Sequence, residues 1–397
     1  MADNTQWHAP GAGAPTASSP AAWQQAPGAA PGWTPPPKPG LIPLHPLSLG
    51  TIIGSSFRVM RRNPAPTFGL SVLLYGFVTI VYAVVLGGIF AYSIGRIASA
   101  SVDDQGALLA GTYGLLGLGS IVPIALVLVV TAILQGIISL EVARATLGEK
   151  LRIRGLWKLA RGRIAALLGW ALILTAAIVV YLLLAIIAIV AVIAFASSAA
   201  NAGAVATTIV ISVLAGLFAT LGVIVLASWL TTKLVFVPTA IVLERLTLRA
   251  AMARSWSLTR GNFWRTLGIQ LLIALIIYAG SSIVSIPVGF IGGIATSLIN
   301  PNGDLNTLLA SEAVLLVVSG ILSIITGAIG LVMQSASVAL LYIDIRMRKE
   351  GLDLELLHYV EAKQAGTPGV GNPYERTAAF TPAAGHPAAA ASGSPWG

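Results

Sequence analysis

Three carboxylates stand in similar places, each at the end of a long apolar run and close to an arginine. The neighbouring groups are Glu141 with Arg144, Glu244 with Arg245, and Asp344 with Arg346 and Arg348. The dipole of a helix disfavours a carboxylate near its C-terminus, so each acid needs a positive partner. We predict structural ion pairs at these positions, with an arginine from an adjacent amphipathic helix as the expected partner. Ionisable groups near a membrane pathway are also candidates for function, so coupling to protons or cations is the alternative.

Three polar side chains inside the apolar runs form a candidate intramembrane polar site. Lys233 precedes Glu244 by 11 residues, which on a continuous helix puts it about 16 Å deeper in the membrane. Its ammonium could snorkel to the interface or gain water where Pro238 interrupts the helix. Gln135 and Gln334 are expected to form hydrogen bonds between helices. Five glycines are expected to allow close helix contact, namely Gly111, Gly114, Gly117, Gly289 and Gly293.

The sequence lacks the common catalytic and metal-binding patterns. It has no cysteine, and its four histidines lie outside the apolar runs, at His8, His45, His358 and His386. It also lacks a His-Glu-x-x-His zinc helix, a Gly-x-Ser-x-Gly elbow and a phosphate-binding glycine loop. We therefore expect neither enzyme activity nor a bound metal or cofactor.

Membrane-spanning helices must position the polar groups. Of 397 residues, 56% are hydrophobic and only 9% are charged, and the mean hydropathy is +0.87, whereas a soluble domain carries about 25% charged residues. About 20 apolar residues cross a bilayer core of about 30 Å. Six apolar runs are long enough for one tilted helix each, at residues 66–95, 107–140, 164–196, 204–237, 266–298 and 309–343. The sequence thus predicts an all-α, polytopic membrane protein.

The distribution of basic residues predicts the orientation of these spans. The connections at 96–106, 197–204 and 299–308 contain a single basic residue, Arg96, and nearly all the others fall on the opposite side. Cytoplasmic loops retain positive charge, so we expect both termini in the cytoplasm and the chain in the cytoplasmic membrane. The net charge of +9 does not indicate nucleic-acid binding, because no soluble basic domain carries it.

Both ends of the chain have the composition of tails, and they define the domain boundaries. Residues 1–40 are rich in proline, alanine and glycine, without the short apolar core of a signal peptide, and residues 361–397 repeat this composition. We expect two disordered cytoplasmic tails around a six-span membrane domain at 41–360. The N-terminal tail could dock a protein partner or serve as a solvated spacer.

An internal repeat of about one hundred residues relates three parts of the membrane domain. Without gaps, shifts of 100 and then 99 residues place Phe57 on Trp157 and Trp256, and Arg61 on Arg161 and Arg260. The order of basic segment, span, outer loop and span recurs three times. The sequence therefore predicts three hairpin repeats, each preceded by a short helix.

Each of these short helices is expected to be amphipathic and to lie in the cytoplasmic interface. In the first copy, apolar residues recur at helical spacing from Leu49 to Met60, with Ser48 as the N-cap and Asn63 before Pro64 as the stop. Arginines outside the apolar stripe would face anionic lipid headgroups. The candidate headgroup contacts are Arg58, Arg61, Arg62, Arg154, Lys158, Arg161, Arg254 and Arg260. Such helices could anchor the bundle or line a laterally open cavity that meets lipid or peptide.

Three segments, at residues 46–64, 237–268 and 340–356, carry a resemblance to a known family. They read PLSLGTIIGSSFRVMRRNP, VPTAIVLERLTLRAAMARSWSLTRGNFWRTLG and LLYIDIRMRKEGLDLEL. Over about residues 41–360 the chain resembles actinobacterial integral membrane proteins of the glycerophosphoryl diester phosphodiesterase membrane domain family. The resemblance implies a six-span helical module of uncharacterised role, and the phosphodiesterase chemistry belongs to a separate soluble barrel. Members often carry an acid after the first Leu-Gly, where this chain has Thr51.

Three functions are compatible with the sequence. The first is a non-catalytic scaffold or partner-binding module in the membrane. The second is a transporter or lipid-handling protein, with a path near Lys233 and Gln334. The third is a membrane subunit that accompanies a separate phosphodiester hydrolase. A cavity that reaches Lys233 would favour the second function, and a dry, packed bundle would favour the first.

Overall fold

A computed structural model describes residues 40–43, 45–197, 202–299, 304–366 and 371–375, and these described residues form helices and connections without a strand. The chain divides into Met1–Pro37 and Lys38–Gly397, and every described residue lies in the second unit. The helices of that unit are α1 (Leu49–Arg62), η1 (Ala65–Gly69, a π-helix), α2 (Leu70–Ala98), α3 (Val102–Gly119), α4 (Ile121–Thr146), α5 (Ile153–Arg161), α6 (Ile164–Ser197), α7 (Ala202–Leu234), α8 (Val237–Leu243), α9 (Leu248–Thr259), α10 (Phe263–Ile299), α11 (Leu305–Glu350) and α12 (Leu352–Gln364).

Six helical segments of the described chain are long and apolar enough to cross a membrane, which confirms the number of spans predicted from the sequence. They are Ala65–Ile97, Asp104–Thr146, Ile164–Ile187, Val210–Leu243, Phe263–Ile299 and Ala310–Glu350. The described part of the chain is thus all-helical and has the spans of a multi-pass membrane protein. The second span consists of α3 and α4, which meet at Ser120. The fourth is interrupted after Leu234 and continues as α8, which has Pro238 in its first turn.

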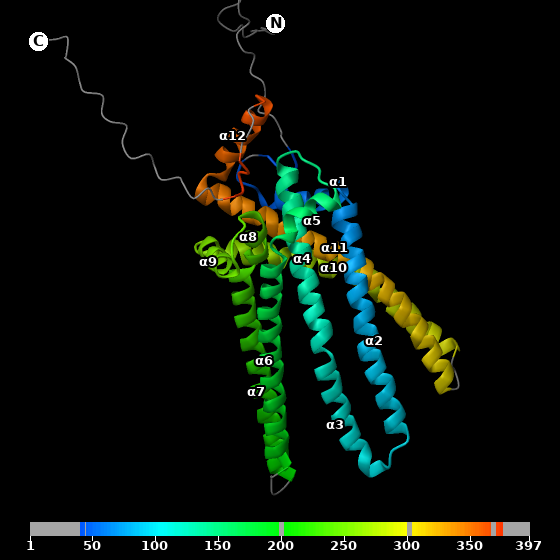
Figure 1. Ribbon diagram of the computed structural model, residues 1–397. Coiled ribbons are helices and arrows are strands. Elements are labelled where there is room, and N and C mark those ends of the chain that lie inside the picture. Colours follow the sequence, from blue (N-terminus) through cyan, green and yellow to red (C-terminus); the bar gives the residue numbers. More distant parts are fainter. Residues whose placement is uncertain (1–39, 44, 198–201, 300–303, 367–370, 376–397) are drawn as a thin grey trace, which may run out of the picture. The chain divides into compact units, whose positions relative to one another are not determined.

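The long helices pack in sequential pairs that extend away from a common core (Figure 1). α2 contacts α3, α6 contacts α7, and α10 contacts α11. Away from the core, most of their surface is apolar and unburied, and the most apolar 18-residue window of Val210–Leu243 buries none of its residues. A surface of this kind is stable in lipid, where the hydrophobic effect does not drive helices together.

The core lies at one end of the helix pairs, where α4, α8 and α11 pack against one another. Fully buried side chains such as Ile138, Ile241 and Leu340 fill it. Polar groups also meet there: the Ser139 and Thr239 hydroxyls are 3.0 Å apart. α1 contacts α11 and α4, α5 contacts α4, and α9 contacts α8 and α7, so the three short helices surround this core.

Local signals explain several helix ends. Ser48 caps α1, its hydroxyl accepting from the Thr51 amide at 3.2 Å, and α1 stops at Asn63, as the sequence predicts. Gly351 has a φ of 67°, a left-handed conformation that costs glycine little, and it separates α11 from α12. Lys349 donates to the carbonyl oxygens of Leu258 and Arg260 at the end of α9.

The C-terminal region is more ordered than we expected from its composition. The sequence predicts a disordered tail from residue 361, but α12 continues to Gln364, and Tyr374 is buried against the core. Residues 1–39, 367–370 and 376–397 of the two predicted tails lie outside the described residues.

Candidate functional site

A buried ion network around Glu244 occupies the polar end of the core. Arg254 of α9 donates from Nε to both Glu244 oxygens at 3.0 Å and from Nη2 to Oε1 at 2.9 Å. The Tyr342 hydroxyl of α11 donates to the same carboxylate. The Arg254 guanidinium also contacts Glu350, with Nη1 2.5 Å from Oε1 and Nη2 2.7 Å from Oε2. Arg346 closes the network, 3.0 Å from Glu350 and 3.6 Å from Glu244.

Burial of Glu244 and Arg254 means that their charges need partners within the protein. The Glu244 side chain is fully buried, and only 9% of the Arg254 side chain is exposed. Burial acts to lower the pKa of Arg254, but its hydrogen bonds to Glu350 and Glu244 outweigh burial and raise that pKa above its ordinary value. Arg254 therefore stays charged. The network ties α8, α9 and α11 together by paired charges, since a buried carboxylate without a partner is strongly destabilising.

A second network centres on Asp344 and holds the start of α1. Its carboxylate accepts from the Leu47 amide at 2.7 Å and from Nε of Arg348 at 3.0 Å. Arg265, at the start of α10, lies 2.9 Å from the same carboxylate. Both arginines also donate to the Leu47 carbonyl, at 3.0 Å for Arg265 and 3.1 Å for Arg348. Asp344 thus joins three parts of the chain that are far apart in sequence.

Glu141 differs from the other two acids in lacking an ion pair with a described residue. It is 1% exposed, and its Oε1 accepts from the Asn63 amide at 3.0 Å, whereas Oε2 has no hydrogen-bond partner. Arg144, the partner suggested by its position in sequence, instead lies 3.1 Å from Glu149. Lys363 of α12 is on the other side of Glu149, at 2.5 Å.

Only one of the pairings suggested by the sequence forms: Asp344 pairs with Arg348, four residues later. The other neighbouring residues have different partners. Arg245 contacts Glu375 at 3.6 Å rather than Glu244, and Arg346 contacts Glu244 and Glu350 rather than Asp344. An arginine from an adjacent short helix is the partner of Glu244, as we expected. For Glu141 the corresponding contact is a neutral asparagine at the end of α1.

Residues 371–375 form a strap that contacts the Glu244 network at Arg346. The Tyr374 side chain is buried, its hydroxyl hydrogen-bonds to Thr146, and its carbonyl accepts from Arg346 at 3.2 Å. Asn372 shapes the strap, because its Oδ1 accepts from the Tyr374 amide and its carbonyl accepts from the Glu375 amide. Burial raises the pKa of Tyr374 to about 12, so the hydroxyl is neutral at physiological pH.

The three predicted intramembrane polar residues do not meet in one place. Gln135 of α4 donates to the Val235 carbonyl at 3.2 Å, in the turn between α7 and α8, so its hydrogen bond joins the second and fourth spans. Lys233 is half-buried, and its ammonium lies 5.4 Å from the ring centre of Trp256 and 5.5 Å from that of Phe263. Gln334 is half-buried on α11, and its side chain hydrogen-bonds no residue that the structure describes. Lys233 therefore has an aromatic environment, favourable for a cation.

The predicted headgroup contacts divide into exposed and engaged side chains. Six are exposed and form no salt bridge among the described residues: Arg58, Arg61, Arg154, Lys158, Arg161 and Arg260. Arg62 is partly buried and donates to the carbonyls of Ala145 and Glu149. The expectation for Arg254 was wrong: its guanidinium is buried in the Glu244 network, because α9 turns this side chain toward the core.

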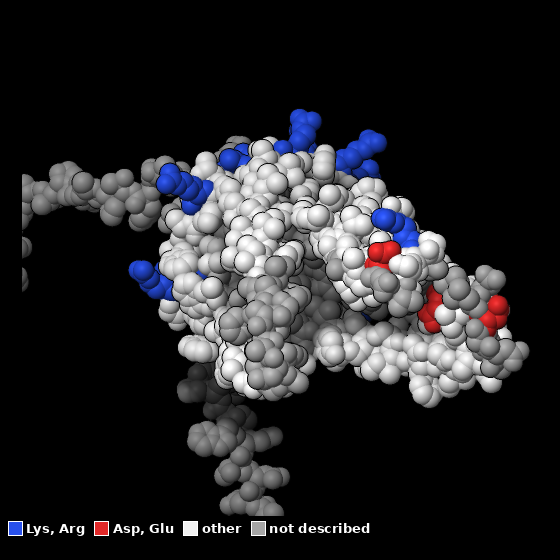
Figure 2. Space-filling model, turned by 90° about the horizontal axis from the view of Figure 1, so that it is seen from below, with Lys and Arg blue, Asp and Glu red and all other residues white. Residues whose placement is uncertain are grey.

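Charge is sparse on the face that Figure 2 shows, which looks onto the far ends of the helix pairs. The surface there is mostly uncharged, and most of the basic side chains in view lie at its edge, while the acidic side chains lie toward one side. Among the described residues, no three histidine or acidic side chains gather as they would around a metal ion. The arrangement described here can hold helices together, bind anions at its exposed arginines and accept apolar surface.

Several residues of these networks have only weak signals in the sequence. Tyr342 and Glu350 lie on α11 two residues before and six residues after the recognised Asp344, on a helix whose contacts the sequence does not give. Tyr374 lies in a segment with the composition of a tail. The spacing of ten residues between Glu244 and Arg254 could have indicated this ion pair. The two side chains meet only because α8 and α9 fold back on each other.

Comparison with known proteins gives a family without a known function. A family profile described as "Domain of unknown function (DUF7847)" matches residues 112–333, more than half of the chain. No curated protein and no solved structure gives a significant match. The matched region begins in α3 and ends in α11, so it includes α4, α8, α9 and the Glu244–Arg254 pair. The chain belongs to the DUF7847 family of domains of unknown function.

Proposed function

We propose that this protein is a non-catalytic scaffold of the cytoplasmic membrane. Its tails bind partners, and they extend from a rigid hub, by which we mean the core at one end of the helix pairs together with the Glu244 and Asp344 networks. The observation that carries the proposal is the Glu244 network, in which the buried charges of Glu244, Arg254 and Arg346 are paired with one another and with the more exposed Glu350. Arg346 also donates to the strap. A group that handles a substrate must be reachable by it. Charges that are fully paired and buried instead hold the helices in one arrangement.

The proposed orientation puts the hub and both tails on the cytoplasmic side. Support comes from the basic residues, because Arg58, Arg61, Arg154, Lys158 and Arg161 are exposed around the hub, and positive charge is retained inside the cell. We further propose that α1, α5 and α9 are amphipathic helices at the inner leaflet, where exposed arginines would meet anionic headgroups.

We also propose that the membrane domain consists of three related hairpins. Two hydrogen bonds support this, since Gln135 with Val235 and Ser139 with Thr239 both join positions exactly one repeat of 100 residues apart. Contacts between equivalent positions are expected where repeated elements pack around a shared axis. The sequential contacts of α2 with α3, α6 with α7 and α10 with α11 also fit this arrangement.

The transporter hypothesis has less support from the geometry. Lys233 would be its central charge, but the Lys233 ammonium faces the rings of Trp256 and Phe263. The hypothesis of a hydrolase subunit and the resemblance to the phosphodiesterase membrane domain family stay predictions. Both would gain support if a phosphodiester hydrolase were captured as the partner.

Crosslinking and affinity capture from intact membranes test the scaffold. The full chain is compared with a chain that lacks residues 1–39 and with one that lacks residues 376–397. A scaffold retains a discrete set of proteins, which at least one of the deletions removes. Identical recovery with all three chains would contradict the role of the tails. Solute flux in proteoliposomes that Lys233→Ala abolishes would contradict the scaffold itself and favour a transporter.

A further inference from the structure

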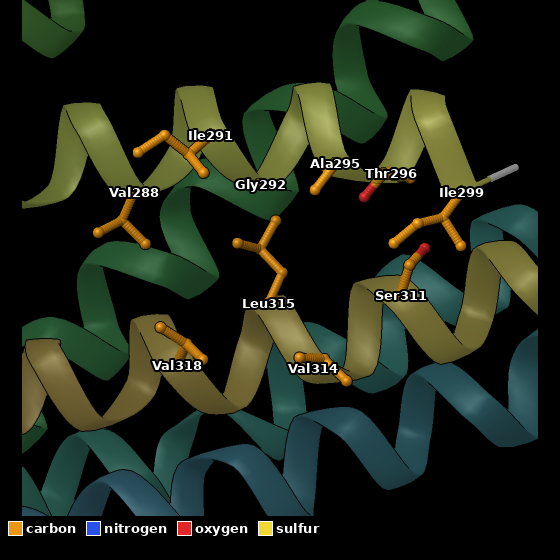
Figure 3. A pocket seen from close by; sticks show the side chains of 10 residues that line it. All are labelled: Val288, Ile291, Gly292, Ala295, Thr296, Ile299, Ser311, Val314, Leu315 and Val318. Atoms are coloured by element: carbon orange, nitrogen blue, oxygen red, sulfur yellow. The ribbon is translucent and has the colours of Figure 1, made fainter.

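Two apolar grooves lie between α10 and α11, and they differ in what stands beside them. The outer groove has a volume of about 360 Å³ and is lined from Val288 to Val318 (Figure 3). Leu315 projects from α11 toward Gly292 of α10, and both walls are almost entirely apolar. The inner groove has a volume of about 270 Å³, and Phe57 from α1 lines it together with residues of α10 and α11.

The inner groove has the dimensions of a site for part of an acyl chain. Its α10 wall runs from Ile276 to Val284, which is about 12 Å along a helix. Gly280 lies in this wall, and the space where its side chain would stand is open. The groove therefore opens along the helix pair, in a region that crosses the membrane.

A positive surface adjoins the end of this groove. Phe57 is 40% exposed, and Arg61 stands four residues later, on the same face of α1. Arg58 follows Phe57 directly and is also exposed, with a hydrogen bond to the Ser55 hydroxyl at 3.0 Å. Neither arginine forms a salt bridge with a described acid, so both can accept an anionic partner.

We propose that this groove and these arginines form a binding site for one anionic phospholipid of the surrounding bilayer. One acyl chain lies in the groove past Gly280, and the phosphate contacts Arg58 and Arg61. The groove is as apolar as the surrounding lipid tails, so the hydrophobic effect does not favour the bound acyl chain. The acyl chain contributes to binding through its fit to the shape of the groove. The selectivity comes from the headgroup: each arginine near the membrane surface favours an anionic lipid by about fivefold.

The site rests on the proposed placement of α1 at the membrane surface, and it commits to a lipid as the occupant. Full-length protein is reconstituted into bilayers that contain a photoreactive phosphatidylglycerol or the matching phosphatidylcholine, and the crosslinks are mapped by mass spectrometry. We expect crosslinks from the acyl chain at Gly280 and its neighbours, with phosphatidylglycerol strongly preferred. Arg58→Gln with Arg61→Gln should reduce this preference by about 30-fold, and Gly280→Leu should remove the crosslinks in the groove.

Matched controls separate this site from general contact with lipid. Arg249→Gln removes an exposed arginine of α9, and Gly289→Leu adds the same side chain at another open glycine of α10, so both should leave the crosslinks unchanged. Equal crosslinking by the two lipids, or insensitivity to the arginine variant, would overturn the site.

The depth of a probe on Arg61→Cys distinguishes a failure of the site from a failure of the architecture. A probe at headgroup depth without lipid preference overturns the site alone. A probe away from the headgroups overturns the proposed placement of α1 together with the site.

Discussion

Replacing Arg254 by glutamine tests the Glu244 network most sharply. The substitution removes three hydrogen bonds to Glu244 and both contacts to Glu350. Among the described residues, Arg346 then remains as the only cation paired with Glu244 and Glu350, and it lies 3.6 Å from Glu244. Removing one partner from a buried ion pair costs about 3–5 kcal/mol, so the free energy of unfolding should fall by about that amount.

Unfolding of the full chain in detergent, followed by tryptophan fluorescence, measures this loss. Trp256 on α9 packs edge-on against Trp229 with ring centres 5.4 Å apart, so the signal reports on the helix that carries Arg254. Arg249→Gln is the matched control, because Arg249 is exposed on the same helix, and its effect should stay within about 0.5 kcal/mol. The double variant with Glu244→Gln should show a coupling free energy of about 2 kcal/mol. Equal stability of Arg254→Gln and Arg249→Gln would refute the network as a structural element.

Three further predictions concern the contacts around the hub. Tyr374 has a pKa of about 12 in the fold, and its phenol ionises near pH 10 when the strap is released. The stability that Tyr374 gives to the strap is therefore complete below about pH 10 and is lost between about pH 10 and 12. A spin label on Glu375→Cys should become mobile in that window, and Tyr374→Phe should remove the transition. Burial acts to raise the pKa of Glu149, but Lys363 and Arg144 lower it overall. The contact between α12 and Glu149 should therefore persist at pH 4.5 and weaken as the pH falls further. A spin label on α12 should report this change, and in Lys363→Gln the label should be mobile at every pH. A Cβ on Gly40 would overlap the carbonyl oxygens of Ala145 and Thr146. Gly40→Ala should therefore lower the free energy of unfolding by about 1–3 kcal/mol and speed proteolysis of the segment before α1. Unchanged proteolysis would contradict this close approach.

The six spans could be predicted because the signal is local. A run of apolar residues long enough to cross the bilayer identifies a helix whatever it packs against, and the N-cap at Ser48 and the stop at Asn63 are equally local. The π-helix between α1 and α2 and the break at Ser120 have weaker signals, since both interrupt apolar sequence.

The contacts between helices could not be predicted with the same success, because a helix turns by about 100° for each residue. We expected Gly289 and Gly293 at close helix contacts, but the space around both is open. Gly292, next to Gly293, approaches Leu315 instead. An error of one residue therefore moves a contact to another face of the helix.

The partners of the acidic residues depend on folds in the chain that sequence spacing does not specify. Glu244 and Asp344 were recognised as needing partners, but Tyr342 reaches Glu244 from a helix 98 residues away. Arg265 reaches Asp344 from the start of α10. A dipole argument predicts that a carboxylate must be paired, whereas only the tertiary structure identifies the pair.

Accessibility of single cysteines tests the placement of the hub at the inner face of the membrane. The chain has no cysteine, so Arg154→Cys on α5 and Ser101→Cys between α2 and α3 each provide one reactive thiol, at positions that are exposed in the structure. In intact cells, a membrane-impermeant maleimide should label Ser101→Cys, and it should label Arg154→Cys only after the membrane is opened. Labelling of Arg154→Cys in intact cells would contradict the proposed orientation and the cytoplasmic scaffold.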